Sequence, residues 1–433
     1  MTPPAAPSSA HTPGAPDTPA AHAQARRTPA AGGSQSAPDA AGRHPHLVWA
    51  LLALALGGFS IGTTEFAAMT LVPFFSPDLG IDVPTAGRVI SAYALGVVVG
   101  APIFATLGAK LPRRTLLILL MMAFAVGNGL SAIAPGYYSM LLFRFLSGLP
   151  HGAYFGVGAL VAASLVAPER RAQAVSMMML GLTVATIIGV PLANALGQWV
   201  GWRWGFAIVA LLSLCTAALV ATQVPKDEVQ PGASAMRELG ALAKRQVWLT
   251  LGIGAIGFGG MFAVYTYLAS TLLEVTGASP SLLPIVFSVF GLGMTVGTLA
   301  CAWAADRALM PTVGGILLWS AVSLALFPFA AGHLGTLLPV VFMIGCGGGL
   351  GAVLQTRLMD VAGDAQTLAA ALNHSAFNAA NALGPWLGGM AIAAGYGWTS
   401  TGWVGLALAI GGLLVWALSL ADDRRTVARR AVT

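Results

Sequence analysis

Glu65 is a carboxylate in the middle of an otherwise uncharged stretch of the chain. From Leu47 to Phe75 the sequence reads LVWALLALALGGFSIGTTEFAAMTLVPFF, and Glu65 is its only ionisable side chain. Such a run is long enough to cross a bilayer as one helix, and a charge placed inside it costs about 2.5–3.5 kcal/mol. A carboxylate that exchanges a proton between two aqueous faces would explain why the chain keeps a charged residue there despite this cost. We therefore interpret Glu65 as a proton-coupling residue.

Arg144 is a charge of opposite sign at a similar predicted depth. If residue 47 lies at the cytoplasmic face, Glu65 and Arg144 both fall roughly 10–15 Å below the outer interface, at 1.5 Å per helical residue. Coulomb attraction in a low dielectric favours their pairing, and protonation of Glu65 would release Arg144. We therefore add Arg144 to the proton-coupling site. The alternative is a static buried ion pair that fixes helix packing.

Other polar and aromatic side chains recur at helical spacing. Arg144, Gly148 and His151 are spaced i, i+4 and i+7, which places His151 deeper on the same face. For His151 a hydrogen-bonded packing role is the alternative, and for each aromatic residue it is a core or lipid-facing position. Aromatic rings with a few convergent amides suit a bulky, partly apolar organic ligand. The further candidates for a substrate cavity are Phe258, Phe262, Tyr265, Asn373, His374, Asn378 and Asn381.

The composition places these residues in a membrane protein. Of 433 residues, 57% are hydrophobic and only 8% are charged, whereas soluble domains carry about 25% charged residues. The cysteines Cys215, Cys301 and Cys346 fall inside apolar runs without metal-ligand spacing, so we interpret them as core residues and expect no metal site. The strings GFSIG (58–62) and GIGAIG (252–257) match enzyme motifs, but both lie inside predicted spans and outside any βα unit.

The hydrophobic pattern predicts an all-α membrane protein with twelve transmembrane helices in two pseudo-symmetric six-helix bundles. We expect the bundles at 47–224 and 247–420, joined by a cytoplasmic linker at 225–246. Residues 1–46 are rich in Ala, Pro, Gly and Ser and predict a disordered cytoplasmic tail, and 421–433 form a second cytoplasmic tail. The twelve predicted spans are 47–75, 84–107, 114–134, 137–165, 172–199, 203–224, 247–273, 280–304, 311–331, 334–358, 367–395 and 398–420.

The distribution of basic residues predicts the orientation. With both termini in the cytoplasm, 18 of the 21 Lys and Arg residues fall in cytoplasmic loops and tails. The remaining three are Arg88, Arg144 and Arg203. The positive-inside rule therefore selects a multi-pass protein of the plasma membrane with cytoplasmic termini. The net charge of +6 arises from this bias and gives no reason to expect a nucleic-acid partner.

Internal repeats indicate a transporter. VWALLALALGGF (48–59) aligns with VWLTLGIGAIGF (247–258), and GVPL (189–192) aligns with GPWL (384–387). Two similar halves of six spans are the parallel-repeat arrangement of many secondary transporters. No P-loop pattern is present in the sequence, so we do not expect ATP to drive this protein directly.

Several motifs resemble those of a known family. The loop ATLGAKLPRR (105–114) has the spacing of the signature G-x-L-a-D-R-x-G-R-K, and AWAADRALM (302–310) is similar to its second copy. GLTVATIIGVPLANALG (181–197) resembles the Gly-Pro element of exporters, and Arg144 with Gly148 matches R-x-x-x-G. Together they resemble the major facilitator superfamily, and more narrowly its twelve-helix drug:proton antiporters, in the branch of arabinose-efflux permeases and chloramphenicol-resistance exporters. The residues that match its conformational motifs are Lys110, Arg113, Arg114, Gly189, Pro191, Asp306 and Arg307.

This resemblance implies a secondary active transporter and not an enzyme. We expect proton-coupled efflux of small drug-like or amphipathic organic molecules by alternating access, with the proton as coupling ion and no cofactor. The expected partners are a small-molecule substrate and the lipid bilayer, and the expected oligomeric state is a monomer. The alternatives are a sugar or nucleoside efflux permease, uptake by proton symport, and a non-transporting membrane sensor.

Overall fold

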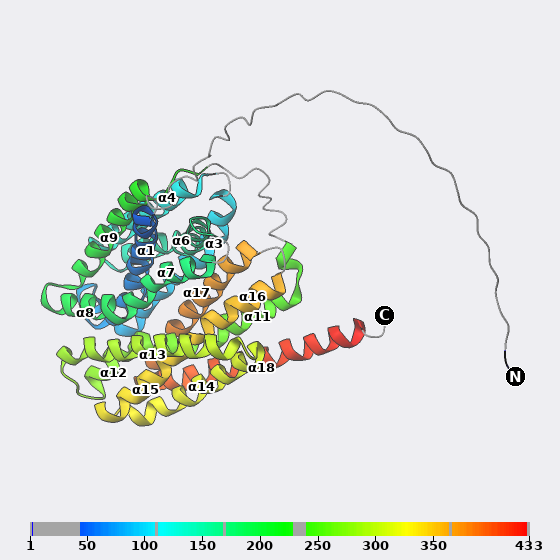
Figure 1. Cartoon of the computed structure of the whole chain (residues 1–433). Coiled ribbons are helices and arrows are strands. Elements are labelled where there is room, and N and C mark those ends of the chain that lie inside the picture. The colour runs from blue at the N-terminus through cyan, green and yellow to red at the C-terminus, as the bar shows by residue number, and fades with distance from the viewer. Residues whose placement is uncertain are drawn as a thin grey trace. The chain divides into compact units, whose positions relative to one another are not determined.

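The computed structural model describes Thr2 and residues 44–108, 111–167, 170–227, 240–362 and 366–430. The helices described below all belong to the compact unit His44–Thr433 (Figure 1). The predicted tail at 1–46 lies almost entirely outside the described residues, as does most of the predicted linker at 225–246. The described residues form helices joined by short connections and contain no strand.

The N-terminal series of helices ends before the linker and the C-terminal series follows it. The first series comprises α1 (His44–Thr70), α2 (Val72–Asp78), α3 (Val83–Leu107), α4 (Arg113–Ala132), α5 (Tyr137–Gly148), α6 (His151–Ser164), α7 (Arg171–Val184), the π-helical turn η4 (Ala185–Gly189), α8 (Val190–Trp199) and α9 (Trp202–Gln223). The second comprises η5 (Gly240–Ala243), α11 (Arg245–Gly257), α12 (Gly259–Glu274), η6 (Pro280–Leu282), α13 (Leu283–Ala305), α14 (Leu309–Ala330), α15 (Leu334–Cys346), η7 (Gly347–Gly349), α16 (Leu350–Ala362), α17 (Gln366–Ala391), η8 (Ile392–Tyr396) and α18 (Ser400–Arg430).

Eleven helical segments among the described residues are long and apolar enough to cross a membrane. They coincide with eleven of the twelve predicted spans. The twelfth, at 367–395, is also helical over α17, but α17 is not among the eleven segments. Its 26 residues include Asn373, His374, Asn378 and Asn381, whose polar side chains lower its mean hydropathy. Length and mean hydropathy alone therefore do not identify α17 as a spanning helix, although it carries much of the candidate site.

The two series repeat the same helix packing. A Cβ on Gly96 of α3 would collide with the carbonyl of Phe145 in α5, and a Cβ on Gly293 of α13 would collide with the carbonyl of Phe342 in α15. Both residues of the second contact lie 197 positions after those of the first. Small residues allow such close backbone approach between membrane helices. The internal repeat is therefore visible both in the sequence and as the same helix crossing in each half.

The same crossing repeats one turn further along these helices. Gly100 approaches the carbonyl of Leu149, and Gly297, again 197 positions later, approaches that of Cys346. Both halves interrupt their fourth span directly after this crossing, at Leu149–Pro150 in the first half and at η7 in the second. In the first half Pro150 has no N–H to continue the helical hydrogen-bond ladder. The interruptions lie at matching positions in the two halves.

Helices of the two halves meet most extensively along two seams. α3 packs along α17, and α8 with η4 packs along α13 (Figure 1). On the first seam Ser91 Oγ donates to Ala382 O at 2.8 Å. On the second, Gln198 Nε2 donates to Pro280 O at 3.0 Å. Gln198 ends its predicted span and Pro280 begins the next half's second span, so this contact lies at the side of the molecule away from the linker.

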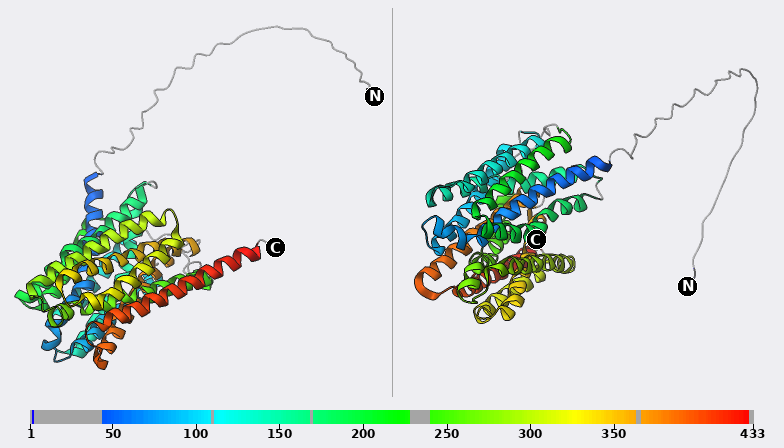
Figure 2. Two further views of the ribbon diagram at one scale, coloured as in Figure 1. Left: turned by 90° about the horizontal axis from the view of Figure 1, so that it is seen from below. Right: turned by 90° about the vertical axis from the view of Figure 1, so that its left-hand side faces the viewer.

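The helix α18 extends beyond the predicted end of its span at residue 420. It continues to Arg430, and Figure 2 shows its C-terminal end running past the neighbouring helices. Asp423 forms an ion pair with Arg357, and Asp422 pairs with Arg245 at 3.3 Å. These pairs connect α18 to α16 and α11, so the first part of the predicted tail at 421–433 is a helix attached to its own half.

Candidate substrate and proton site

Glu65 lies in a buried layer between the two halves. It is 7% exposed, and its Oε1 accepts a hydrogen bond from Asn381 Nδ2 at 3.2 Å. Asn381 is fully buried on α17, and its Oδ1 has no hydrogen-bond partner among the described residues. The carboxyl group is thus joined to the opposite half through a single amide that retains a free acceptor.

Arg144 does not form the predicted ion pair with Glu65; the ion pairs among the described residues do not include these two side chains. Its Nη1 instead donates to Thr64 Oγ1 at 3.2 Å, and Thr64 in turn donates to Asn128 Oδ1 at 2.7 Å. Consecutive helical residues point about 100° apart, at 3.6 residues per turn. Thr64 therefore faces α4 and α5 while Glu65 faces α17, and this rotation separates the two charges.

Two aromatic rings hold the guanidinium of Arg144. Its Cζ lies 4.2 Å from the centroid of the Tyr93 ring and 5.2 Å from that of Phe206. A cation placed over an aromatic face is attracted by the ring quadrupole, more strongly where water is excluded. Arg144 is fully buried, and its Nε and Nη2 have no hydrogen-bond partner among the described residues. The N–H donors on these two nitrogens are available to a ligand with an acceptor group.

His151 and His374 meet across the two halves. The His151 Nδ1 is hydrogen-bonded to Tyr93 Oη at 2.9 Å, and its ring centroid lies 6.1 Å from that of His374. His374 also stacks on Phe155 with a centroid distance of 4.9 Å and an interplanar angle of 5°. The first half supplies His151 and Phe155 from α6, and the second supplies His374 from α17. The two predicted cavity histidines therefore belong to one inter-half cluster.

The predicted aromatic residues of span 7 also lie at this junction and are buried. Phe262 and Tyr265 contact Phe66 of α1, at centroid distances of 6.1 and 5.6 Å. Phe258, in the break between α11 and α12, packs on Phe377 of α17 at 4.6 Å. In this conformation the three rings fill space against one another. They would be exposed to a ligand only if these contacts separate.

The amides of α17 differ in their bonding. Asn378 Nδ2 donates to the carbonyl of His374 at 3.1 Å, while its Oδ1 has no partner among the described residues. Asn373 is 5% exposed. The spacing of His374, Asn378 and Asn381 predicted one polar face, and two of the three contact or hydrogen-bond the first half. The polar face of α17 is therefore directed at the junction between the two halves.

Residues of the conformational motifs lie apart from this cluster. Arg307 donates to the carbonyl of Trp303 and stacks over that ring at 3.6 Å, while Asp306 is exposed. A Cβ on Gly189 would contact Thr63 of α1, so this glycine lets η4 approach α1 closely. Pro191 lies in the first turn of α8. Lys110 is outside the described residues.

Asp227 takes a position at the start of α4 that the sequence did not indicate. Its carboxylate accepts hydrogen bonds from the backbone N–H groups of Arg113 and Arg114, at 2.8 and 3.1 Å. An anion is favourable at a helix N-terminus, where backbone donors are unpaired. Arg114 also donates to the carbonyl of Ala221. These motif arginines thus tie α4 to the end of α9 within one half.

Several residues of the cluster were not predicted from the sequence. Phe155 follows His151 by four positions, so the helical period could have indicated it. The sequence around Phe66, Tyr93 and Asn128 is apolar or mixed in character and does not mark them as site residues. Tertiary packing brings them into the cluster. Their places required knowledge of which helices are neighbours.

The profile of the Major Facilitator Superfamily matches residues 54–362 and 251–432. The chain belongs to this superfamily. Like other members, it is a multi-pass membrane transporter for small molecules and not an enzyme. Transporters of the superfamily generally need no cofactor and use ion gradients.

Individual superfamily members show the same relationship. The chain is 39% identical to the inner membrane transport protein YdhP of Escherichia coli (strain K12), over 87% of this chain and 97% of that protein. It is 33% identical to a chloramphenicol resistance protein of Streptomyces lividans, over 87% and 96%. A probable sugar efflux transporter of Pasteurella multocida is 29% identical over 85% and 91%. In fold it is similar to a crystal structure of the nucleoside transporter NupG, with a TM-score of 0.66 and 15% identity over 86% and 99% of the two chains.

Proposed function

We propose that this transporter is a proton-coupled antiporter that exports small drug-like or amphipathic organic molecules by alternating access. The bundles would span 47–224 and 247–420, with both termini in the cytoplasm. The observation that supports the proposal best is the hydrogen bond between Glu65 and Asn381, because it connects the two halves through a titratable group. The relative named as a chloramphenicol resistance protein agrees with export of such compounds.

The chemistry of this contact supports a coupling role. A protonated carboxyl group has one O–H donor and retains acceptor capacity. Protonated Glu65 could therefore donate to the free Oδ1 of Asn381 while accepting from its Nδ2. The ionised form keeps only one of these bonds and leaves a charge in the membrane interior, at a cost of about 2.5–3.5 kcal/mol. Proton uptake would then favour the closed contact and proton release would loosen it.

In the proposed cycle Glu65 takes up a proton from the outer aqueous face. The protonated contact with Asn381 favours return to the conformation described here. Substrate binding near Arg144 and His151 then drives release of the proton to the cytoplasm. A fixed positive charge at Arg144 would favour this release.

The test is transport driven by a pH gradient in proteoliposomes. Glu65→Gln is isosteric, cannot ionise and can make both hydrogen bonds of the protonated form, so we expect substrate binding to persist and gradient-driven accumulation to disappear. Glu274→Gln makes the same chemical change at an exposed residue at the end of α12 and should leave transport unchanged. Full coupled transport by Glu65→Gln would reject the role of Glu65 and direct attention to His151 and His374.

Efflux of a sugar or nucleoside is the second candidate function. The free acceptors Asn378 Oδ1 and Asn381 Oδ1 favour it, because hydroxyl groups of such ligands could donate to them. The relative named as a probable sugar efflux transporter points the same way. Ligand-induced thermal shifts across a panel of antibiotics, sugars and nucleosides would separate the two. A shift with sugars alone would overturn the first choice.

A further inference from the structure

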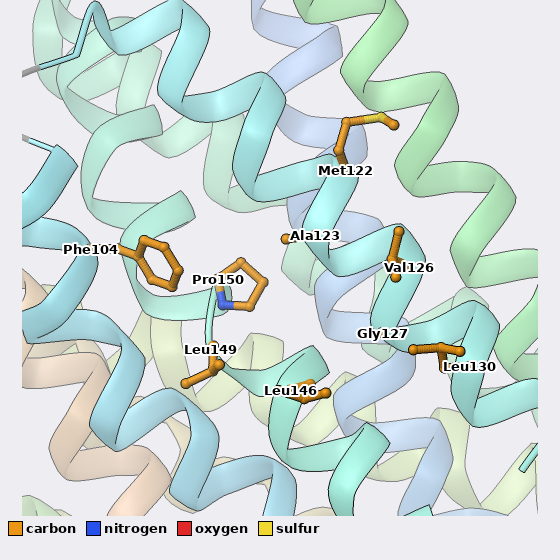
Figure 3. A pocket seen from close by; sticks show the side chains of 9 residues that line it. All are labelled: Phe104, Met122, Ala123, Val126, Gly127, Leu130, Leu146, Leu149 and Pro150. Carbon is orange, nitrogen blue, oxygen red and sulfur yellow. The ribbon is translucent and has the colours of Figure 1, made fainter.

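A pocket of about 340 Å³ lies beside the break in the fourth span. Ala123 on α4 is directed toward Pro150 at the break, and Phe104 of α3 lies beyond it (Figure 3). The lining also includes Met122, Val126, Leu146 and Leu149. The pocket belongs to the first half alone.

This pocket lies on the surface that the membrane surrounds. Its rim residues Met122, Val126 and Leu146 are 42%, 57% and 38% exposed, and they belong to the spanning segments Arg113–Ala132 and Tyr137–Ser164. Every residue that lines the pocket is apolar or glycine. An apolar cavity without polar partners does not hold ordered water. At this depth the surrounding solvent is hydrocarbon.

The second half has a larger side chain at one of the equivalent positions. At the repeat distance of 197 positions, Met122 corresponds to Trp319 and Leu146 to Met343. The indole of Trp319 reaches across α15 and donates from Nε1 to Met343 O at 2.8 Å. A side chain on one helix thus covers the neighbouring helix of the pair. The first half has the flexible, smaller Met122 at this position.

The correspondence also holds at the break itself. Ala123 and Pro150 both line the pocket, and their equivalents Ser320 and Gly347 are in contact range, since a Cβ on Gly347 would lie 2.8 Å from Ser320 Oγ. Ala123 and Pro150 therefore correspond in position to a pair in contact range in the second half. There the residue equivalent to Met122 is the bulky, largely apolar Trp319, which is 41% exposed.

We propose that the pocket binds one acyl chain of a bilayer phospholipid, which takes the place that Trp319 occupies in the other half. The hydrocarbon would pack against Leu149 and Pro150 and brace the break between α5 and α6. These helices carry Arg144 and His151, so occupancy would restrain the segment that holds the buried cluster. The occupant is a lipid chain because the pocket is apolar, opens at spanning depth and lacks any group to bind a polar headgroup.

The test is photolabelling in proteoliposomes with a phosphatidylcholine that carries a diazirine near the middle of one acyl chain. Labelled peptides are quantified by mass spectrometry. We expect labelling at 122–130 and 146–150 to exceed that at the exposed residues Leu318 and Val322 of α14 by several-fold. Equal labelling of these regions would mean ordinary annular lipid and would overturn the proposal.

Two reciprocal variants test whether the labelling of 122–130 and 146–150 comes from a lipid chain inside the pocket. Met122→Trp gives the first half the indole that the second half has as Trp319, and it should reduce labelling of the pocket several-fold. Leu211→Trp, at a 60% exposed position on α9, should leave labelling of the pocket unchanged. Trp319→Met should create new labelling at α14 and α15. Size-exclusion profiles establish that each variant is folded. Unchanged pocket labelling in Met122→Trp, or cross-linking of 122–130 to a second copy of the chain, would contradict the proposal.

Discussion

At the scale of single residues, Arg144 shows how a buried charge is accommodated without an adjacent carboxylate. One hydroxyl group and two aromatic rings contact it directly, and its nearest polar partner is Thr64. Leaving a buried cation without compensation is costly, so each of these contacts contributes to holding it. Tyr93 has two functions here, because its ring faces Arg144 while its hydroxyl group bonds His151.

Two substitutions of Tyr93 separate these functions. Tyr93→Phe keeps the ring and removes the hydrogen bond to His151, so we expect a loss of about 0.5–1.5 kcal/mol in the free energy of unfolding. Tyr93→Leu also removes the ring below Arg144 and should lose roughly 2 kcal/mol more. Denaturant unfolding of the purified protein in detergent measures both. Equal losses in the two variants would show that the ring contributes nothing beyond the hydroxyl group.

At the scale of helices, the glycine crossings fix how the second and fourth spans of each half pack. Gly100 and Gly297 approach backbone carbonyls that cannot move away without displacing a helix. Overpacking of a close contact typically costs 1–3 kcal/mol or more. Because the crossing is the same in both halves, the two glycines should have the same importance.

We therefore expect Gly100→Ala and Gly297→Ala to lower the melting temperature to a similar extent. The control is Gly315→Ala in α14, where a Cβ would have no atom within 4 Å. An added methyl group in open helical space should stabilise by about 0.5–1 kcal/mol. Thermal unfolding by fluorescence-detected size exclusion compares the three. A harmless Gly100→Ala beside a damaging Gly297→Ala would show that the repeated geometry is not equally constrained.

These elements also show what could be predicted from the sequence. The pattern of apolar runs predicted the helices, and the paired glycines of α3 and α13 indicate close helix contacts by their four-residue spacing. The pairing of Glu65 with Arg144 was wrong, because depth alone does not specify the direction in which a side chain points. Asn381 lies far from Glu65 in the sequence, and only the packing of α1 and α17 brings them together.

At the scale of the whole transporter unit, the described residues form hydrogen bonds between the halves toward the side away from the linker. Ser91 with Ala382, and Gln198 with Pro280, are examples. With the proposed orientation this side faces the cell exterior. The described conformation would then be closed to the outside, and alternating access requires these contacts to separate.

A cross-link on this side should arrest transport. In a background in which the three native cysteines are replaced, a bis-methanethiosulfonate reagent should cross-link Ser91→Cys to Ala382→Cys, since the Ser91 hydroxyl lies 2.8 Å from the Ala382 carbonyl oxygen and the two helices are therefore close. Cross-linking should abolish proteoliposome transport, and a reducing agent should restore it. Each single cysteine is the control. Unimpaired transport by the fully cross-linked protein would mean that this seam does not open.

The capping of α4 by Asp227 has a practical consequence for dividing the gene. A division of the gene at the end of the last spanning helix of the first half would fall after Gln223, where α9 ends. A fragment that stops there would leave the backbone donors of Arg113 and Arg114 without their acceptor. Two co-expressed halves should therefore be separated after Asp227. They should also be separated before Lys244, whose Nζ donates to the carbonyl of Ala362 within the other half.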